Sequence, residues 1–209
     1  MSFKYYSTLL SFLVCLGFPS RTFGQYLQKE TVKDKTYAII YSEGLPGAAK
    51  WEAGMKMMRD GATIRHQVSK GNDGNLSVND KIQMRFIVAP TDVENVTWEQ
   101  AGGVTGGDNL NADFTLTKIN VGCGGYSDGS GRKWRVPTQR ELQLMWLFRE
   151  PVGIIYPQGK MESISTKNYW ASTEKDANNA WVFDFKQDVP YCSWQSKTAK
   201  ANVRCVSDY

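Results

Sequence analysis

The stretch Trp134-Arg135-Val136-Pro137-Thr138-Gln139-Arg140-Glu141-Leu142 predicts the start of a helix in this 209-residue chain. Thr138 and Glu141 have capping-box spacing, so each side chain can accept a hydrogen bond from a backbone N–H that the helix start leaves without a partner. The apolar residues that follow at helical spacing predict a buried face: Leu142, Met145 and Trp146. Pro151 is expected to end the helix, because proline cannot donate to the helical hydrogen-bond ladder.

Short strands are expected on both sides of this helix. Segments rich in aromatic and β-branched residues predict them: Tyr37–Tyr41, Ile82–Val88, Tyr169–Thr173, Ala180–Phe185, Tyr191–Trp194 and Asn202–Val206. Alternation in the fourth segment predicts one face formed by Trp181, Phe183 and Phe185, and an opposite face formed by Val182 and Asp184. Strands around a helix, joined by long loops, predict an α+β domain.

Two further helices and a loop region are expected. Trp98 follows Asn95 and Thr97, either of which could cap a helix start, and Trp51–Met58 predicts another short helix. Residues 102–131 are rich in glycine but contain neither a Gly-Lys-Ser/Thr sequence nor an intact GxGxxG spacing. They therefore predict surface loops that need positive φ angles, and no phosphate-binding loop.

The N-terminus has the three parts of a secretory signal peptide. Lys4 supplies a positive charge, residues 5–18 are mostly apolar, and the small residue Gly24 precedes the polar Gln25. The apolar run is shorter than the ~20 residues of a membrane span, and an N-terminal anchor helix is the alternative. Cys15 lies inside the apolar run, which argues against a lipoprotein signal. Cleavage after Gly24 predicts a protein that is secreted or lies in the cell envelope, in the periplasm or on the outer surface.

Charge and cysteine content narrow the function classes. The formal net charge is +4, and removal of residues 1–24 takes away Lys4 and Arg21, which leaves about +2. A net charge this close to zero does not indicate nucleic-acid binding. Three cysteines remain after cleavage, which predicts one disulfide and one free thiol in an oxidising compartment: Cys123, Cys192 and Cys205. With His66 as the one histidine and no CxxC pair, the sequence predicts no metal site and no cofactor.

Four segments, taken in order, resemble one known family. They are Thr97–Ala101, Trp134–Leu142, Tyr169–Thr173 and Val203–Val206. The series resembles the C-terminal domain of the bacterial collagen-like adhesin Lcl, which has a Trp-Arg-Leu-Pro-Thr helix start, a Tyr-Trp-Ser-Ser/Thr strand and a closing Val-Arg-Cys-Val strand. Here valine replaces the leucine of the helix start and alanine replaces a serine of the strand. The longer helix-start motif also resembles surface and fimbria-associated proteins of the Bacteroidetes type.

The resemblance implies a C-type-lectin-like fold with two helices, a small twisted, mostly antiparallel sheet and long loops. It implies such a domain over residues 81–209, preceded by an N-terminal extension over residues 25–80. In that fold a cysteine near the first helix is bonded to one in the last strand, which implies a Cys123–Cys205 disulfide and leaves Cys192 free. A Cys192–Cys205 bond between neighbouring strands is the alternative, since the glycine-rich insert changes the usual spacing.

The implied function is recognition, and no enzyme is expected. The calcium-binding signatures of lectins, Glu-Pro-Asn and Trp-Asn-Asp, are absent from the sequence, and no residue near the cysteines lowers a thiol pKa. In lectin-like domains the ligand contacts the loop region between the middle strands, which corresponds here to residues 171–200. The candidate ligand-binding residues are Glu174, Asn178, Asn179, Tyr191, Trp194, Lys197 and Lys200.

The chemistry of these residues indicates the kind of partner. Aromatic faces stack on sugars or anchor a protein, and amides and lysines add hydrogen bonds and positive charge. The expected partner is a glycan, which the lysines would allow to be anionic, or a protein. Trp170 and Trp181 are expected in the core, whereas Tyr191 and Trp194 fit the core and a binding surface equally well. A structural or assembly subunit of a surface fimbria, with other envelope subunits as partners, is the alternative.

Overall fold

The computed structural model describes residues 24–32, 34–46, 81–105, 117–157, 167–175, 178–185 and 191–209. At positions 43–46, 81–84, 104, 173 and 174 it describes the backbone. The predicted signal peptide and the predicted helix Trp51–Met58 lie outside the described residues.

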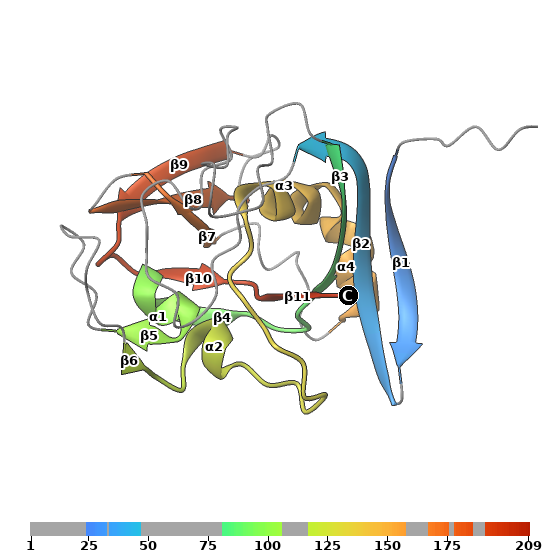
Figure 1. Ribbon diagram of the computed structural model, residues 1–209, viewed down its shortest axis with the longest axis horizontal. Coiled ribbons are helices and arrows are strands. Elements are labelled where there is room, and N and C mark those ends of the chain that lie inside the picture. Colours follow the sequence, from blue (N-terminus) through green and yellow to red (C-terminus); the bar gives the residue numbers. More distant parts are fainter. Residues whose placement is uncertain are drawn as a thin grey trace, which may run out of the picture.

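Strands are the commonest elements of the described structure (Figure 1). They are β1 (Gln25–Val32), β2 (Lys35–Pro46), β3 (Lys81–Val88), β4 (Val93–Val96), β5 (Val104–Thr105), β6 (Thr117–Lys118), β7 (Asn168–Glu174), β8 (Asn179–Asp184), β9 (Tyr191–Ser196), β10 (Ala201–Val203) and β11 (Val206–Asp208). One sheet has the order β1-β2-β3-β11 and is antiparallel, and a second has the order β4-β10-β7-β8-β9 with only β10 and β7 parallel. A small third sheet pairs β5 with β6.

The described residues form four helices, where the resemblance implied two: α1 (Trp98–Gly102), α2 (Gly122–Gly125), α3 (Gln139–Leu147) and α4 (Arg149–Ile155). The predicted start of α3 is confirmed, because Thr138 and Glu141 form a complete capping box. Thr97 caps α1 in the same way, with Gln100 as its partner. The expectation that Pro151 ends the helix is wrong. Helix α3 already ends at Leu147, and Pro151 lies in the first turn of α4, where a missing N–H costs no hydrogen bond.

The inner strands of both large sheets are buried on both faces, and two hydrophobic cores result. Along β2, Ile39 faces the first core and Ile40 faces the second, and both are fully buried. Helices α1 and α2 contribute to the first core, and α3 and α4 to the second. In Figure 1, α1 and α2 lie below β10 and α3 lies above it. This arrangement explains why β2 is apolar over consecutive residues and does not alternate with polar ones.

The alternation predicted for β8 is present, with one difference. Phe183 and Phe185 face the second core and Trp181 packs at its margin. Val182, on the opposite face, is buried as well, because that face of β8 lies against the first core. Trp170 is fully buried, as expected, and its indole N–H donates to the carbonyl of Val96 at 2.9 Å.

Strands β1 and β2 pack into the same body as the described strands β3 and β11. Ala38, Ile39 and Ile40 pair with β3 in register and have no exposed surface. Each isoleucine that folding buries in this way stabilises the folded state by about 1.5–3 kcal/mol. Figure 1 shows β1 as the outermost strand of this sheet.

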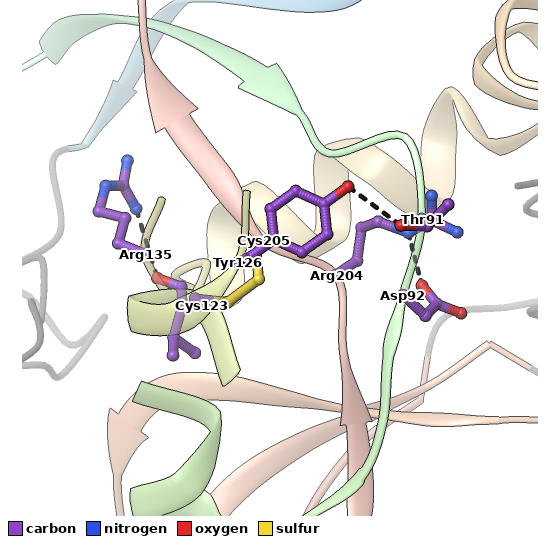
Figure 2. The surroundings of a disulfide bond; sticks show 8 residues. Thr91, Asp92, Cys123, Tyr126, Arg135, Arg204 and Cys205 are labelled. Atoms are coloured by element: carbon purple, nitrogen blue, oxygen red, sulfur yellow. Dashed lines mark hydrogen bonds and ion pairs between the residues drawn. A yellow bond between two sulfur atoms is a disulfide. The ribbon is translucent and has the colours of Figure 1, made fainter. Parts of the chain in front are cut away.

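A disulfide joins α2 to the last part of the chain (Figure 2). Cys123 and Cys205 are bonded, with 5.4 Å between their Cα atoms, so the pairing implied by the resemblance is confirmed. Cys192 is free and half-buried. Next to the bond, Arg204 donates to Asp92, and the hydroxyl groups of Tyr126 and Thr91 are 3.0 Å apart. The bond therefore fixes α2 against the segment that connects β10 with β11.

The glycine-rich stretch is only partly a surface loop. The predicted positive φ is present at four described glycines: Gly103, Gly122, Gly129 and Gly131. However, Gly103 and Gly122 are buried between α1 and α2. A Cβ atom on Gly122 would lie 1.8 Å from the carbonyl oxygen of Gln100. Glycine is needed there for the close approach of the two helices as well as for its φ of 61°.

Candidate ligand-binding surface

Four of the seven predicted binding residues lie on three neighbouring strands of the five-stranded sheet, β7, β8 and β9. Glu174 ends β7, Asn179 begins β8, and Tyr191 and Trp194 lie on β9, the last strand of the sheet. In the antiparallel register Trp194 pairs with Trp181. Figure 1 places β8 and β9 at the opposite side of the molecule from β1.

Trp194 is the main exposed aromatic residue of this surface. Its side chain is 51% exposed, although it pairs with the half-buried Trp181. The ammonium group of Lys175 lies 4.0 Å from the centre of the Trp194 ring, which is the geometry of a cation–π contact. Trp194 thus has an exposed aromatic surface with a positive charge beside it. This combination can stack on a sugar ring or anchor a protein side chain and also attract a negative group.

Tyr191 does not share a face with Trp194. It is 59% exposed, but side chains three residues apart on a strand point to opposite faces of the sheet. The register agrees: Tyr191 pairs with Asp184, and Trp194 pairs with Trp181 on the other face of β8. The two aromatic residues therefore cannot form one continuous platform. This separation follows from the two-residue period of a strand and could have been predicted from the sequence.

The two asparagines hold the turn between β7 and β8 through their backbone. The carbonyl of Asn178 accepts a hydrogen bond from the N–H of Lys197 at 2.8 Å, and that of Asn179 accepts one from Lys175 at 3.0 Å. Asn178 is exposed and Asn179 is half-buried. The turn thus places Lys175 close to β9.

The two predicted lysines contact α1. Lys197 is only 3% exposed, and its ammonium group lies 4.7 Å from the centre of the Trp98 ring. Its backbone carbonyl accepts the N–H of Trp98 at the start of α1. Lys200 is exposed, and its ammonium group donates to Gln100 of α1 at 2.9 Å. Both residues join the end of the β9 hairpin to α1, and Lys175 is the cation beside Trp194.

Cys192 lies on the same face of β9 as Trp194, but its thiol is not activated. Burial raises the pKa of Cys192 to about 11. A thiol with this pKa is almost entirely protonated at neutral pH and is a poor nucleophile. Among the described residues, no group of three or more His, Cys, Asp or Glu side chains is placed to bind a metal ion.

A cavity beside the disulfide was not predicted from the sequence. Its volume is about 660 Å³, and its lining comes from β6, α2, the segment before α3, and β11: Lys118, Gly124, Tyr126, Arg132, Lys133, Trp134, Arg135, Ser207 and Asp208. The run Arg132-Lys133-Trp134-Arg135 was the available signal, since cations and an aromatic residue follow one another directly.

Comparison with known proteins identifies the family. The family model of the Lcl C-terminal domain matches residues 69–207, which is well over half of the chain. The protein belongs to the Lcl C-terminal domain family. No curated protein matches this sequence. Strands β1 and β2 lie before the matched region, and yet β2 pairs with β3 inside it.

Membership of the Lcl C-terminal domain family indicates a surface adhesion-type module. The Cys123–Cys205 disulfide fits a protein outside the cytoplasm, because such bonds persist in oxidising compartments. Within the described part of the chain, no helix is long and apolar enough to cross a membrane.

Proposed function

We propose that this protein is a non-enzymatic recognition module of the bacterial envelope that binds a glycan or a protein without calcium. In this proposal a signal peptide directs it out of the cytoplasm, and its domain has a C-type-lectin-like fold. The ligand contacts the β8–β9 end of the five-stranded sheet. The observation that carries the proposal is the half-exposed Trp194 with the ammonium group of Lys175 over its ring.

Trp194 is suited to this role because the rest of its strand already supports it. The residue lies on β9, which pairs with β8 over six residues, so its backbone is fixed before a ligand arrives. Binding to a preformed surface loses less conformational entropy than binding to a disordered one. The proposed contact surface is the Trp194 face of β9, and Tyr191 is assigned to the opposite face.

The position of β2 supports recognition over assembly. A strand-rich N-terminal segment that pairs with another subunit would favour a fimbrial accessory protein. Here β2 is instead an inner strand of the protein's own sheet, between β1 and β3. The assembly role therefore stays the alternative.

A glycan array with the purified mature protein tests the proposal. Trp194→Ala should weaken binding at least tenfold, as expected for an aromatic anchor worth more than about 1.4 kcal/mol. Tyr26→Ala is the matched control, because Tyr26 is also 51% exposed but lies on β1 of the other sheet. Near-ultraviolet circular dichroism should show that both variants fold.

Two results would decide against the proposal. Equal loss of binding in Trp194→Ala and Tyr26→Ala would show that the ligand does not bind specifically at the β9 surface. An absence of binding to glycans and to candidate surface proteins, together with co-purification with envelope fibres, would favour the assembly role.

A further inference from the structure

A concave site lies apart from the β9 surface, in the cavity beside the disulfide. The cavity shares no lining residue with the Trp194 surface. Its volume of about 660 Å³ is within the range of ligand-binding pockets, which extends from roughly 300 to 1,000 Å³. It could therefore hold a compact organic molecule.

The cavity is lined by more positive than negative charge. Lys118, Arg132 and Lys133 contribute three cations, and among the residues that the structure describes no carboxylate forms an ion pair with any of them. Arg135 is different, because Glu141 and Asp208 both pair with it. One guanidinium and two carboxylates leave one negative charge. Together with the three cations that form no ion pair with a described carboxylate, this group gives a surplus of two positive charges.

The surroundings of the cavity are fixed in place. The guanidinium group of Arg132 lies over the Tyr37 ring, 5.0 Å from its centre. Tyr126 packs edge-on against Trp134, with 5.2 Å between ring centres. Gly124 belongs to α2, which the bond from Cys123 holds against the last strands. A site whose walls are held in this way needs little reorganisation to bind a ligand.

We propose that this cavity binds a phosphate monoester carried on a compact ligand. A phosphate monoester has a charge of about −1.5 to −2 at neutral pH, which matches the surplus of two positive charges. A carboxylate or a sulfate ester has a single negative charge and matches it less well. An arginine and two lysines are the side chains that recognise phosphate oxygens, arginine through paired hydrogen bonds and lysine as a point charge. The remaining volume and the Tyr126 ring accommodate the organic part.

The experiment uses isothermal titration of the mature protein at constant ionic strength, with glucose 6-phosphate, inorganic phosphate, methyl sulfate and glucose as probes. Glucose 6-phosphate should bind at one saturable site, with a Kd on the order of 1 mM or lower. Methyl sulfate and glucose should bind at least tenfold more weakly. Lys118→Gln/Lys133→Gln should weaken glucose 6-phosphate binding at least tenfold, and Lys29→Gln, which removes an exposed positive charge on β1, should change it less than twofold.

The outcomes that would overturn the proposal are distinct. One is an unchanged affinity of the double variant for glucose 6-phosphate, and another is an equal affinity of the protein for glucose and glucose 6-phosphate. The third is a titration signal that never saturates and depends on ionic strength alone. Inorganic phosphate identifies the group recognised, because its binding must be lost in the same double variant. Trp194→Ala should leave glucose 6-phosphate binding intact, so the failure of one site does not decide the fate of the other.

Discussion

Replacement of Glu141 by glutamine should strongly destabilise the fold, because it removes the charge that pairs with a buried arginine. Arg135 and Glu141 are 5% and 3% exposed, and two hydrogen bonds of 2.8 and 2.6 Å join them. Glu141 also accepts the backbone N–H of Thr138 at the start of α3, at 2.8 Å. Although burial alone would lower it, the charges of Glu141 and Asp208 raise the pKa of the Arg135 guanidinium above its usual value, so Arg135 stays charged.

The size of the effect follows from what glutamine can replace. Its carbonyl oxygen can still accept from Thr138 and from Nη1 of Arg135, but its NH₂ group then faces Nη2 of Arg135, donor against donor. Breaking a buried pair by removal of one partner costs about 3–5 kcal/mol. Asp208 cannot compensate fully, since its side chain is 51% exposed and its interaction is weakened by water. A cost of about 3–5 kcal/mol would be a large part of the total stability of a domain of this size.

Urea unfolding under oxidising conditions, followed by tryptophan fluorescence, gives the change in the free energy of unfolding. Asp208→Asn is the control for the loss of an exposed partner and should cost about 1 kcal/mol or less. Arg135→Met/Glu141→Gln should be more stable than Glu141→Gln alone, because the uncompensated buried charge is gone. A cost below about 1 kcal/mol for Glu141→Gln, or no gain in stability from the second substitution, would show that Glu141 does not stabilise the fold by pairing with a buried charge.

Three further predictions use other parts of the fold. Gly131→Ala should lower the free energy of unfolding by about 1–2 kcal/mol, because this position has a positive φ. Gly122→Ala should lower it clearly more, because the new Cβ atom would also collide with backbone atoms. Equal losses of stability in urea unfolding would contradict this. Tyr156→Phe should lower the free energy of unfolding by about 1–3 kcal/mol, because the hydroxyl of Tyr156 joins buried backbone groups of β2 and β3. Tyr126→Phe should lower it less, because the hydroxyl of Tyr126 is more exposed. With its pKa raised from 9.0 to about 11, Cys192 should react with iodoacetamide at pH 8 about 100-fold more slowly in the native protein than in urea. The folded state holds this proton more tightly, so the contribution of Cys192 to stability should fall as the pH rises from 9 towards 11. Fast labelling of the native protein would contradict a raised pKa for the Cys192 thiol.

The sequence predicts the local features of this protein better than the distant ones. The capping box of α3 was predictable because both partners lie within four residues of each other. The burial of Lys197 was not, because it depends on Trp98, which lies 99 residues earlier in the chain and is brought close by folding. The cavity has the same origin, since β6 and β11 meet there only in three dimensions.

The glycines show the same limit in another way. A positive φ can be expected from glycine content, and it is present in this stretch. Whether a glycine lies in an open loop or between two helices depends on what packs against it. A Cβ atom on Gly131 would meet no other atom within 4 Å, whereas one on Gly122 would collide with the backbone of α1. The residue type is identical, and only the neighbours differ.

The motif that identifies the family has a structural role, and this affects how its ligand must be sought. Trp134, Arg135 and Glu141 are each 5% exposed or less, so their main role is to set the start of α3 and the packing around it. Trp134 and Arg135 also form part of the cavity wall, but they lie too deep to contact a ligand at the β9 surface. Another protein could share all of them and still bind something else. Specificity must therefore depend on exposed residues outside the buried motif, such as Trp194 on β9 and Lys133 beside the cavity. Substitutions at these two positions should change ligand binding and leave the free energy of unfolding nearly unchanged, whereas substitution of Glu141 should lower the free energy of unfolding and leave binding at the Trp194 surface of the folded protein nearly unchanged.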